Sequence, residues 1–571
     1  MTARILLRGS AALLLTALCV GTMRSTETRV ALALSDAIVT AVEAQGPDLG
    51  TEAQRASGKV LYDKNCAQCH GDKGDGDGYA TPHLFPKPRN FTSGKFKVRT
   101  TPNGALPTQQ DLINIIRRGM PYTSMPAWPD LSDSQLADLA YYIKTFYPDF
   151  ASAESVPTPV ELPSAPASTD ASIELGKKLY VETGCVKCHG NLGRGDGASA
   201  PTLMDELGQP IRAADLSLSW TFRGGSSRED IFRTMTTGLN GTPMPSFTDA
   251  LTPEQRWAIT DYISSLSSSE GPAYKNLVVA KLVLDKIDLT KGAANFASAP
   301  AARFPVVGQI MEPGRQFHPP ATSVVVQAIY DEESIAFLVR WHDMRADKTG
   351  TAGLTLPVTI ADEVDKPAAA PAADAAADPF AEQTTAEAPP SEFNDAVAIQ
   401  VPSSVPTGAR KPYFIFGDAQ GPVDLWFFDL GREDPLQFTG RGSADIAAND
   451  TGDVTGTASY DQGEWSVIFK RPLRPSAGAE FAPGGFLPIA FSVWDGFSRE
   501  RGNRRALTSW YSVYVEPEVV TSAAGPMVRT ALLILLAELL VIGLVRRAHR
   551  SGARAKADPP QSGYGEAATS V

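Results

Sequence analysis

Two stretches of this chain are nearly the same: "NCAQCHGDKGDGDG" at residues 65–78 and "GCVKCHGNLGRGDG" at residues 184–197. They start 119 residues apart, and both have a Cys-x-x-Cys-His core followed by a Gly-x-x-Gly-x-Gly-Asp-Gly tail. The sequences on either side of the two stretches also match. We therefore expect two copies of one domain in tandem in the N-terminal half.

The Cys-x-x-Cys-His core is typical of a site where c-type haem is attached covalently. The two thiols form thioethers with the vinyl groups of one haem, and the adjacent histidine lies under the iron. The competing interpretations are a redox dithiol, a disulfide and a zinc site, which would need two more ligands in a chain with only five cysteines. The residues predicted to hold the two haems are Cys66, Cys69 and His70 in the first copy, and Cys185, Cys188 and His189 in the second.

The repeat also predicts the second axial ligand of each iron. When "DLINIIRRGMPYTSMPAW" is aligned with "DIFRTMTTGLNGTPMPSF", Met125 matches Met244, whereas Met120 matches a leucine. Met125 and Met244 each lie 55 positions after the histidine of their own copy. We therefore predict Met125 and Met244 as the axial ligands, and we expect Met120 to pack in the core or at the haem edge.

The flanking sequences predict the fold of each copy. After each methionine, residues 131–146 and 251–266 begin with the spacing of a helix capping box and continue with apolar residues at helical spacing. Helix, Cys-x-x-Cys-His motif, loop, methionine and closing helix is an order that resembles an all-α class I cytochrome c domain. The resemblance covers residues 52–149 and 170–268, and the Pro/Ser/Ala-rich residues 150–169 are predicted to be a linker.

The predicted ligand set has a functional consequence. A histidine and a methionine together fill both axial positions of the iron and raise its potential. An iron with both positions filled does not readily bind a small substrate. The pattern therefore favours electron transfer, with no catalytic residue at the haem, over a dihaem peroxidase, which would need one open iron.

Length, charge and the N-terminal sequence indicate the number of domains, the absence of a nucleic-acid partner and the compartment. A chain of 571 residues should hold three or four domains, and its net charge of −12 offers no basic patch for nucleic acid except at the C-terminal end. Residues 1–45 begin with arginines before an apolar run, which predicts a signal peptide or an N-terminal anchor. Because haem c is attached outside the energy-coupling membrane, we expect a periplasmic location.

The C-terminal region predicts a membrane anchor. Residues 528–545 are predicted to span the membrane, although their apolar core, Thr530–Val545, is slightly short for a span of about 20 residues, and arginines follow directly. Because positive residues stay on the inner side, residues 546–571 are expected to be cytoplasmic and the rest periplasmic. Glu538 lies inside the span, either facing a partner or tolerated as a protonated acid.

Residues 273–516 lack helical periodicity and predict a mainly-β sandwich. A low-complexity insert at residues 366–392 cannot bury a core and is expected to be a flexible loop. The expected strands are "TSVVVQAIY", "SIAFLVRWHD", "DAVAIQV", "VDLWFFDL", "EWSVIFKRPL", "LPIAFSVWDG" and "LTSWYSVYV". The predicted fold is therefore multidomain, with two all-α cytochrome c domains, one β-sandwich and a C-terminal transmembrane helix.

The same region carries a second resemblance. "KPYFIFGDAQGPVDLWFFD", "YDQGEWSVIFKRPL" and "IAFSVWDGFSRERGNRRALTSWYSVYV" resemble the haem-binding gamma subunits of ethylbenzene dehydrogenase, dimethylsulfide dehydrogenase, selenate and chlorate reductases and nitrite oxidoreductase. The resemblance implies a haem b held by a methionine and a lysine. Phe416 and Arg504 stand near those two positions, and neither can ligate iron. A haem b is therefore doubtful, and its ligands are unknown.

The functional hypothesis combines the two resemblances. The chain is expected to be a membrane-anchored dihaem electron-transfer subunit of a molybdopterin oxidoreductase of the nitrite/nitrate type. By resemblance, its partners would be a molybdopterin catalytic subunit, an iron–sulfur subunit and a respiratory redox protein. One alternative is a dihaem shuttle whose sandwich serves only for docking, and a weaker one is a free-standing haem enzyme.

Overall fold

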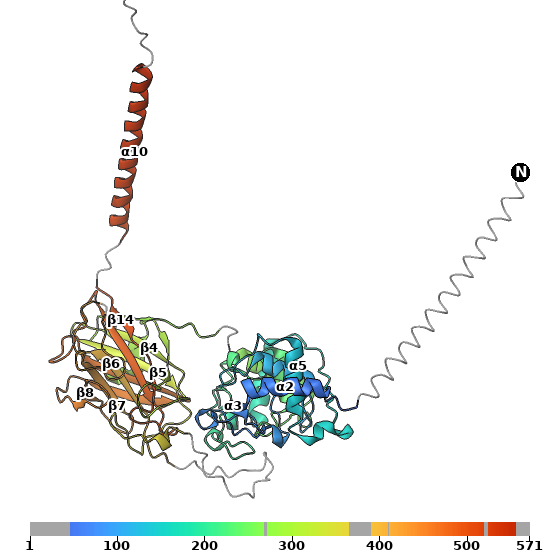
Figure 1. Cartoon of the computed structure of the whole chain (residues 1–571). Helices are drawn as coiled ribbons and strands as arrows, with labels where there is room; N and C mark the ends of the chain where they lie inside the picture. Colours follow the sequence, from blue (N-terminus) through green and yellow to red (C-terminus); the bar gives the residue numbers. More distant parts are fainter. Residues whose placement is uncertain (1–45, 268–270, 365–389, 409, 519–522, 556–571) are drawn as a thin grey trace, which may run out of the picture. The chain divides into compact units, whose positions relative to one another are not determined.

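The computed structural model describes residues 46–267, 271–364, 390–408, 410–518 and 523–555 (Figure 1). The chain divides into two compact units, one ending at Val515 and the other beginning at Glu516. The predicted signal or anchor at residues 1–45, nearly all of the predicted insert and the end of the tail lie outside the described residues.

The first repeat is a small helical domain, as the sequence predicts. Its helices are α2 (Glu52–Asn65), α3 (Ala67–His70), α4 (Gln109–Arg118) and α5 (Asp133–Lys144). The capping box expected at the start of α5 is present, because the Gln135 amide donates to the Ser132 hydroxyl and the Ser132 amide donates to the Gln135 side chain at 2.9 Å.

The second repeat has the same elements in the same order. They are α6 (Asp170–Glu182), α7 (Val186–His189), α8 (Arg228–Thr237) and α9 (Pro253–Leu266). The matching capping box joins Thr252 and Gln255 at the start of α9. The predicted linker at residues 150–169 begins within two short 3₁₀ helices, η3 (Pro148–Ala151) and η4 (Ala153–Ser155), and residues 156–169 form no regular secondary structure.

The first and last helices of each repeat cross at a glycine. A Cβ on Gly58 would lie 2.0 Å from the Asp138 carbonyl oxygen, and one on Gly176 would lie 1.9 Å from the Ala258 carbonyl oxygen. Any side chain at either position would force the two helices apart. The glycine of "GKVLY" and "GKKLY" therefore fixes the helix pair on which each Cys-x-x-Cys-His motif is built.

A tyrosine near the end of the first helix then ties the motif to this pair. The Tyr62 hydroxyl donates to the Gly71 carbonyl at 2.7 Å, and the Tyr180 hydroxyl donates to the Gly190 carbonyl at 2.7 Å. Both tyrosine side chains are almost fully buried. Because each glycine directly follows the motif histidine, these bonds hold the end of the motif against the helix.

Residues 277–515 form the predicted β domain. Seven strands match the predicted segments: β4 (Ser323–Tyr330), β5 (Ser334–His342), β6 (Ala396–Pro402), β7 (Val423–Asp429), β11 (Glu464–Pro472), β12 (Phe486–Trp494) and β14 (Tyr511–Val515). The sequence analysis missed seven shorter or more polar strands: β1 (Leu277–Leu282), β2 (Ala302–Pro305), β3 (Val307–Gly308), β8 (Leu436–Gly440), β9 (Ile446–Ala448), β10 (Thr455–Asp461) and β13 (Ala506–Leu507).

The strands run in the order β10-β11-β5-β4-β1-β14-β12-β6-β7-β8-β9, and β12 joins two halves of the sheet. Side chains of both halves meet in one core, where the rings of Phe337 in β5 and Trp426 in β7 lie 5.9 Å apart. Two stacked layers around one core make a β-sandwich. β1 pairs in parallel with both β14 and β4, which a chain of simple hairpins would not give.

The second unit contains one long helix, α10 (Ala524–Ala555). Within it, residues Ala524–Arg550 have a mean hydropathy of 2.4 in their most apolar window, and the described helix contains the predicted span at residues 528–545. A helix of 27 residues is about 40 Å long, which exceeds the ~30 Å of a bilayer core. By length and composition, α10 is a candidate membrane-spanning helix.

Candidate haem sites

Each Cys-x-x-Cys-His motif forms one turn of helix. The His70 amide donates to the Cys66 carbonyl at 2.9 Å in α3, and the His189 amide donates to the Cys185 carbonyl at 2.9 Å in α7. In a helical turn, residues at positions i, i+3 and i+4 lie on the same face. Both thiols and the imidazole of each motif therefore face the same side, as attachment to one planar ligand requires.

A backbone carbonyl orients each motif histidine. His70 Nδ1 lies 3.0 Å from the Arg89 carbonyl oxygen, and His189 Nδ1 lies 2.9 Å from the Ala214 carbonyl oxygen. Because a carbonyl oxygen can only accept, Nδ1 carries the proton and donates, which leaves the Nε2 lone pair free to bind a metal. Burial lowers the pKa of both histidines, which favours the neutral form. Both acceptors are backbone carbonyls, which no residue type marks in a sequence, so they could not be predicted from it.

The two methionine loops have the same hydrogen bonds. The Met120 amide donates to the Met125 carbonyl at 3.2 Å, and the Leu239 amide donates to the Met244 carbonyl at 3.0 Å. The Met125 amide donates to the Thr123 hydroxyl, just as the Met244 amide donates to the Thr242 hydroxyl, at 3.2 Å in both. The loops are thus equivalent residue by residue, which supports the alignment of Met125 with Met244.

One cavity of about 1370 Å³ joins the two sets of predicted ligands. It exceeds the roughly 300–1,000 Å³ of a pocket for one small molecule. Both Met120 and Met125 line it, so the choice between them rests on the repeat. All the predicted haem c residues lie on its wall: Cys66, Cys69, His70, Met125, Cys185, Cys188, His189 and Met244.

The remaining wall suits a large aromatic ligand. Apolar side chains of the cytochrome domain cores, including Phe91, Leu112 and Ile116 in the first and Phe247 in the second, line the cavity. Among the described residues, neither motif belongs to a group of three or more His, Cys, Asp or Glu side chains placed to hold a metal ion, as a zinc site would require. The residues present therefore fit covalent haem better than a thiolate metal centre.

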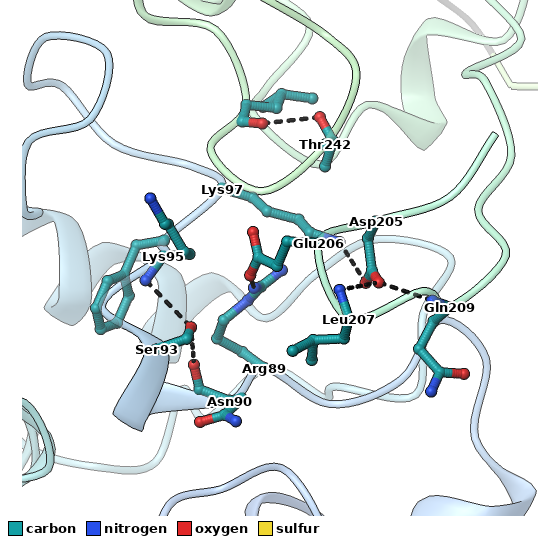
Figure 2. Close-up of polar contacts among 12 residues, drawn as sticks. Arg89, Asn90, Ser93, Lys95, Lys97, Asp205, Glu206, Leu207, Gln209 and Thr242 are labelled. Atoms are coloured by element: carbon teal, nitrogen blue, oxygen red, sulfur yellow. Dashed lines mark hydrogen bonds and ion pairs between the residues drawn. The ribbon is translucent and has the colours of Figure 1, made fainter. Parts of the chain in front are cut away.

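Charged side chains connect the two cytochrome domains beside this cavity (Figure 2). Arg89 Nη1 of the first domain lies 2.9 Å from Glu206 Oε1 of the second, and Lys97 Nζ lies 3.8 Å from Asp205 Oδ2. Arg99 donates across the same junction to the Thr237 carbonyl at 2.7 Å. The sequence analysis singled out none of these residues, because their partners lie more than a hundred positions away.

In the described part of the sandwich, Phe416 and Arg504 stand near the two positions where the resembled gamma subunits hold haem b. Phe416 is buried, and the guanidinium of Arg505 lies 3.8 Å from the centre of its ring. Arg504 is buried too and donates to the Asp362 carbonyl. The two expected positions are thus filled by a packed phenylalanine and an arginine, and neither offers iron a lone pair.

Other side chains that could replace the haem b ligands are engaged or exposed. Met311 is 66% exposed. His318 Nε2 donates to the His83 carbonyl at 2.8 Å, and His342 Nδ1 donates to the Gly463 carbonyl at 2.6 Å.

The sandwich also buries a cluster of acids that the sequence analysis did not find. Carboxylate oxygens of Asp343, Asp395 and Asp495 all lie within 4.8 Å of one another. Burial, reinforced by the neighbouring acids, raises the pKa of Asp343 and Asp395 well above the usual range. Burial and the charge of Asp495 likewise raise the pKa of Glu500 to about 8.

Comparisons with known proteins agree with the geometry of the two repeats. Residues 55–146 and 173–267 match the family model described as cytochrome c. The two repeats are therefore cytochrome c domains, and domains of this family imply covalently bound haem c. The chain is an electron-transfer protein of cytochrome c type, with a domain in its C-terminal half that resembles the gamma subunits.

Two curated relatives match parts of the chain. One is a Haloferax mediterranei protein, ORF7, named as a respiratory nitrate reductase haem subunit, with 33% identity over 124 residues, or 21% of this chain and 44% of the relative. The other is the cbb3-type cytochrome c oxidase subunit FixP of Bradyrhizobium sp. (strain ORS 278), with 26% identity over 224 residues, or 38% of this chain and 62% of the relative. The chain thus spans less than two thirds of either relative.

Solved structures give two further likenesses. A chain of the Kuenenia stuttgartiensis reducing HAO-like protein complex is 42% identical to this chain. The match covers 39% of this chain and 100% of that one, with a TM-score of 0.37. A carbohydrate binding module of family 9 from Caldicellulosiruptor kristjanssonii is 9% identical, with 43% of this chain and 98% of that one covered and a TM-score of 0.24.

Proposed function

We propose that this chain is the membrane-anchored electron-transfer subunit of a respiratory oxidoreductase complex, with one haem c in each cytochrome domain. The observation that carries the proposal is the single cavity lined by both Cys-x-x-Cys-His motifs and both Met-Pro loops. In each domain the histidine and the methionine would hold the haem iron, and an iron held in this way would supply a centre that exchanges electrons rather than one that binds a small substrate.

Each group of residues has a defined role in this function. Haem c, once bound, supplies a centre that gains and loses one electron. The four cysteines fix it covalently, and the carbonyls of Arg89 and Ala214 hold the two imidazoles with Nε2 facing the cavity. Thr123 and Thr242 brace the methionine loops through the backbone. These contacts fix the positions of the predicted ligands in the folded chain.

Sequence resemblance supports the partners. Residues 273–516 resemble the gamma subunits of molybdopterin oxidoreductases, and one curated relative is named as a respiratory nitrate reductase haem subunit. The partners proposed are therefore a molybdopterin catalytic subunit with its iron–sulfur subunit on one side and a respiratory redox protein on the other. The proposed reaction of the complex is of the nitrite/nitrate type.

The proposed membrane helix α10 determines on which side of the membrane the other domains would lie. α10 would cross the inner membrane, with Arg546 and Arg547 holding its C-terminal end on the cytoplasmic side. The cytochrome domains and the sandwich would then lie in the periplasm, where haem c is attached.

A second role for the sandwich follows from its filled haem b positions. With Arg505 stacked on Phe416, the sandwich would serve as a docking domain, and electrons would pass from the partner straight to a haem c. This favours the alternative function of a tethered dihaem shuttle with a docking module. Arg194 of the second motif lies 3.5 Å from Glu464 of β11, so the sandwich borders the second haem site.

Copurification tests the proposal. The chain, tagged after Val571, is isolated from membranes of its native host in mild detergent, and the associated proteins are identified by mass spectrometry together with the molybdenum content. We expect a molybdopterin subunit and an iron–sulfur subunit in equal amounts with the chain. A chain that carries two haems c but purifies without either subunit would support the shuttle and contradict the complex.

A further inference from the structure

Four basic side chains gather where the two cytochrome domains meet. We call Arg89, Lys97, Arg212 and Arg223 the junction cluster; the first two belong to the first domain and the others to the second. All four line the cavity that contains both haem motifs. The cluster therefore faces the predicted ligands of two irons.

Two members of the cluster already have acidic partners. The Arg89 side chain is 17% exposed and pairs with Glu206 at 2.9 Å, while Lys97 pairs with Asp205 at 3.8 Å (Figure 2). Asp205 and Glu206 come from the second domain, so both pairs cross the junction. These pairs neutralise two of the four positive charges.

The other two members make no such pair. Within the described part of the chain, the side chains of Arg212 and Arg223 form no hydrogen bond or ion pair. The guanidinium of Arg212 lies 4.9 Å from the ring centre of Phe85, a residue of the first domain. The charge of Arg212 also acts on the buried carboxyl of Asp495, which lines the same cavity. No acid is among the groups that shift the pKa of Arg223, so Arg223 is the member of the cluster that most lacks a negative neighbour.

The positive charges of the cluster also act on one another in pairs. Desolvation and the charge of Arg212 lower the pKa of Arg223. Desolvation, with the charges of Arg89 and Arg223 among the other causes, lowers the pKa of Lys97 to about 8. Such a concentration of positive charge is costly unless an anion enters the cavity.

Haem brings the missing anion, because its edge carries two propionate carboxylates. An arginine guanidinium binds a carboxylate through two parallel hydrogen bonds. The cluster also adjoins the proximal side of both sites, since Arg89 supplies the carbonyl for His70 and Arg212 lies two residues before Ala214, the acceptor for His189. The positive charges of Arg212 and Arg223, the affinity of a guanidinium for a carboxylate and the position of the cluster beside both haem motifs therefore all fit haem propionates.

We propose that the junction cluster binds haem propionates from both cytochrome domains, with Arg212 and Arg223 as the direct contacts, so that one group of charges sets the redox potential of both haems. The proposal rests on the proposed function in one respect, the presence of a haem c in each domain. Reduction of an iron removes one positive charge, so a nearby cation stabilises the reduced form and raises the potential.

The test measures the two potentials by spectroelectrochemical titration of the purified full-length chain. The absorbance change is resolved into two one-electron components. Arg223→Gln should lower both potentials, whereas Arg223→Lys, which retains the charge, should leave them close to those of the unchanged chain. Glu206→Gln removes a negative charge from the same cluster and should shift both potentials upward. If Arg223 and Glu206 only held the fold together, their substitutions would not shift the two redox potentials in opposite directions.

Arg117→Gln is the matched control. It removes the same charge from the first domain, but Arg117 is 45% exposed, pairs with Asp133 and does not line the cavity. Its effect on either potential should be much smaller than that of Arg223→Gln.

Three results would overturn the proposal: potentials that stay unchanged in Arg223→Gln and Glu206→Gln, a shift confined to one component, or an equal shift in Arg117→Gln. The haem content of each preparation is counted first. Fewer than two covalent haems would contradict the proposed function, whereas unmoved potentials in a chain with two haems would contradict the cluster alone.

Discussion

Replacing the crossing glycine of the first cytochrome domain should loosen that domain and spare the second. In Gly58→Ala the new methyl group would lie 2.0 Å from the Asp138 carbonyl oxygen, whereas ordinary van der Waals contact begins near 3.4 Å. α2 and α5 must therefore separate by roughly an ångström or more. Overpacking of this kind costs typically about 1–3 kcal/mol.

Helix propensity opposes part of this cost. Alanine is favoured over glycine inside a helix by about 1 kcal/mol. The methyl group would meet backbone, which cannot rotate away, so the cost lies toward the upper end of this range and the net loss should be up to about 2 kcal/mol, or up to a thirtyfold increase in local opening. Ser57→Ala is the control, because Ser57 is the preceding residue of α2 and is exposed.

Hydrogen exchange followed by mass spectrometry measures this effect with an internal reference. In Gly58→Ala, peptides from α2 and α5 should exchange faster, while those from α6 and α9 keep their protection. Gly176→Ala should give the reverse pattern, since its Cβ would meet the Ala258 carbonyl oxygen. Unchanged protection of α2 and α5 in Gly58→Ala, or equal loss in both domains, would refute the role given to these glycines.

Three further predictions concern the ligands, the anchor and the sandwich. Met125→Ala and Met244→Ala should each remove half of the long-wavelength Met–iron absorption band while haem stays attached; loss of the band in Met120→Ala instead would show that the repeat alignment is wrong. A reporter fused after Val571 should be active only in the cytoplasm, and trimming of the C-terminal tail by a protease added outside the cell would contradict this orientation. Glu500, with a folded pKa of about 8 against a usual value near 4.5, holds its proton more tightly when folded. Its contribution to stability is thus complete below about pH 4.5 and is lost as the pH rises to about 8, by at most about 1.4 kcal/mol per pH unit. Denaturant titrations should therefore show a shallower pH dependence in Glu500→Gln, and an identical slope would exclude that contribution.

The sequence predicts the cytochrome domains well because their determinants are local. A thiol pair and histidine within one helical turn, and a capping box at the start of α5, are readable without knowledge of the fold. The internal repeat adds a second copy as a check, which is how Met125 is separated from Met120.

The features that the sequence does not predict depend on distant partners. The acceptor of His70 is a backbone carbonyl 19 residues away, and Arg89 reaches Glu206 across 117 residues. Short strands such as β3 are held by pairing with β13 far along the chain rather than by their own propensity. In the sandwich, the sequence identifies Phe416 as a residue that cannot ligate iron, but only the fold brings Arg505 onto its ring.

The most direct test of the central claim is a count of covalent and extractable haem in the full-length chain. The chain is purified from a host that attaches haem c, haem is extracted with acidified organic solvent, and both fractions are quantified as pyridine haemochromes. Two covalently bound haems per chain and no extractable haem are the predicted result. A single covalent haem would contradict the two-site account of the cavity, and one extractable haem b per chain would contradict the docking role given to the sandwich.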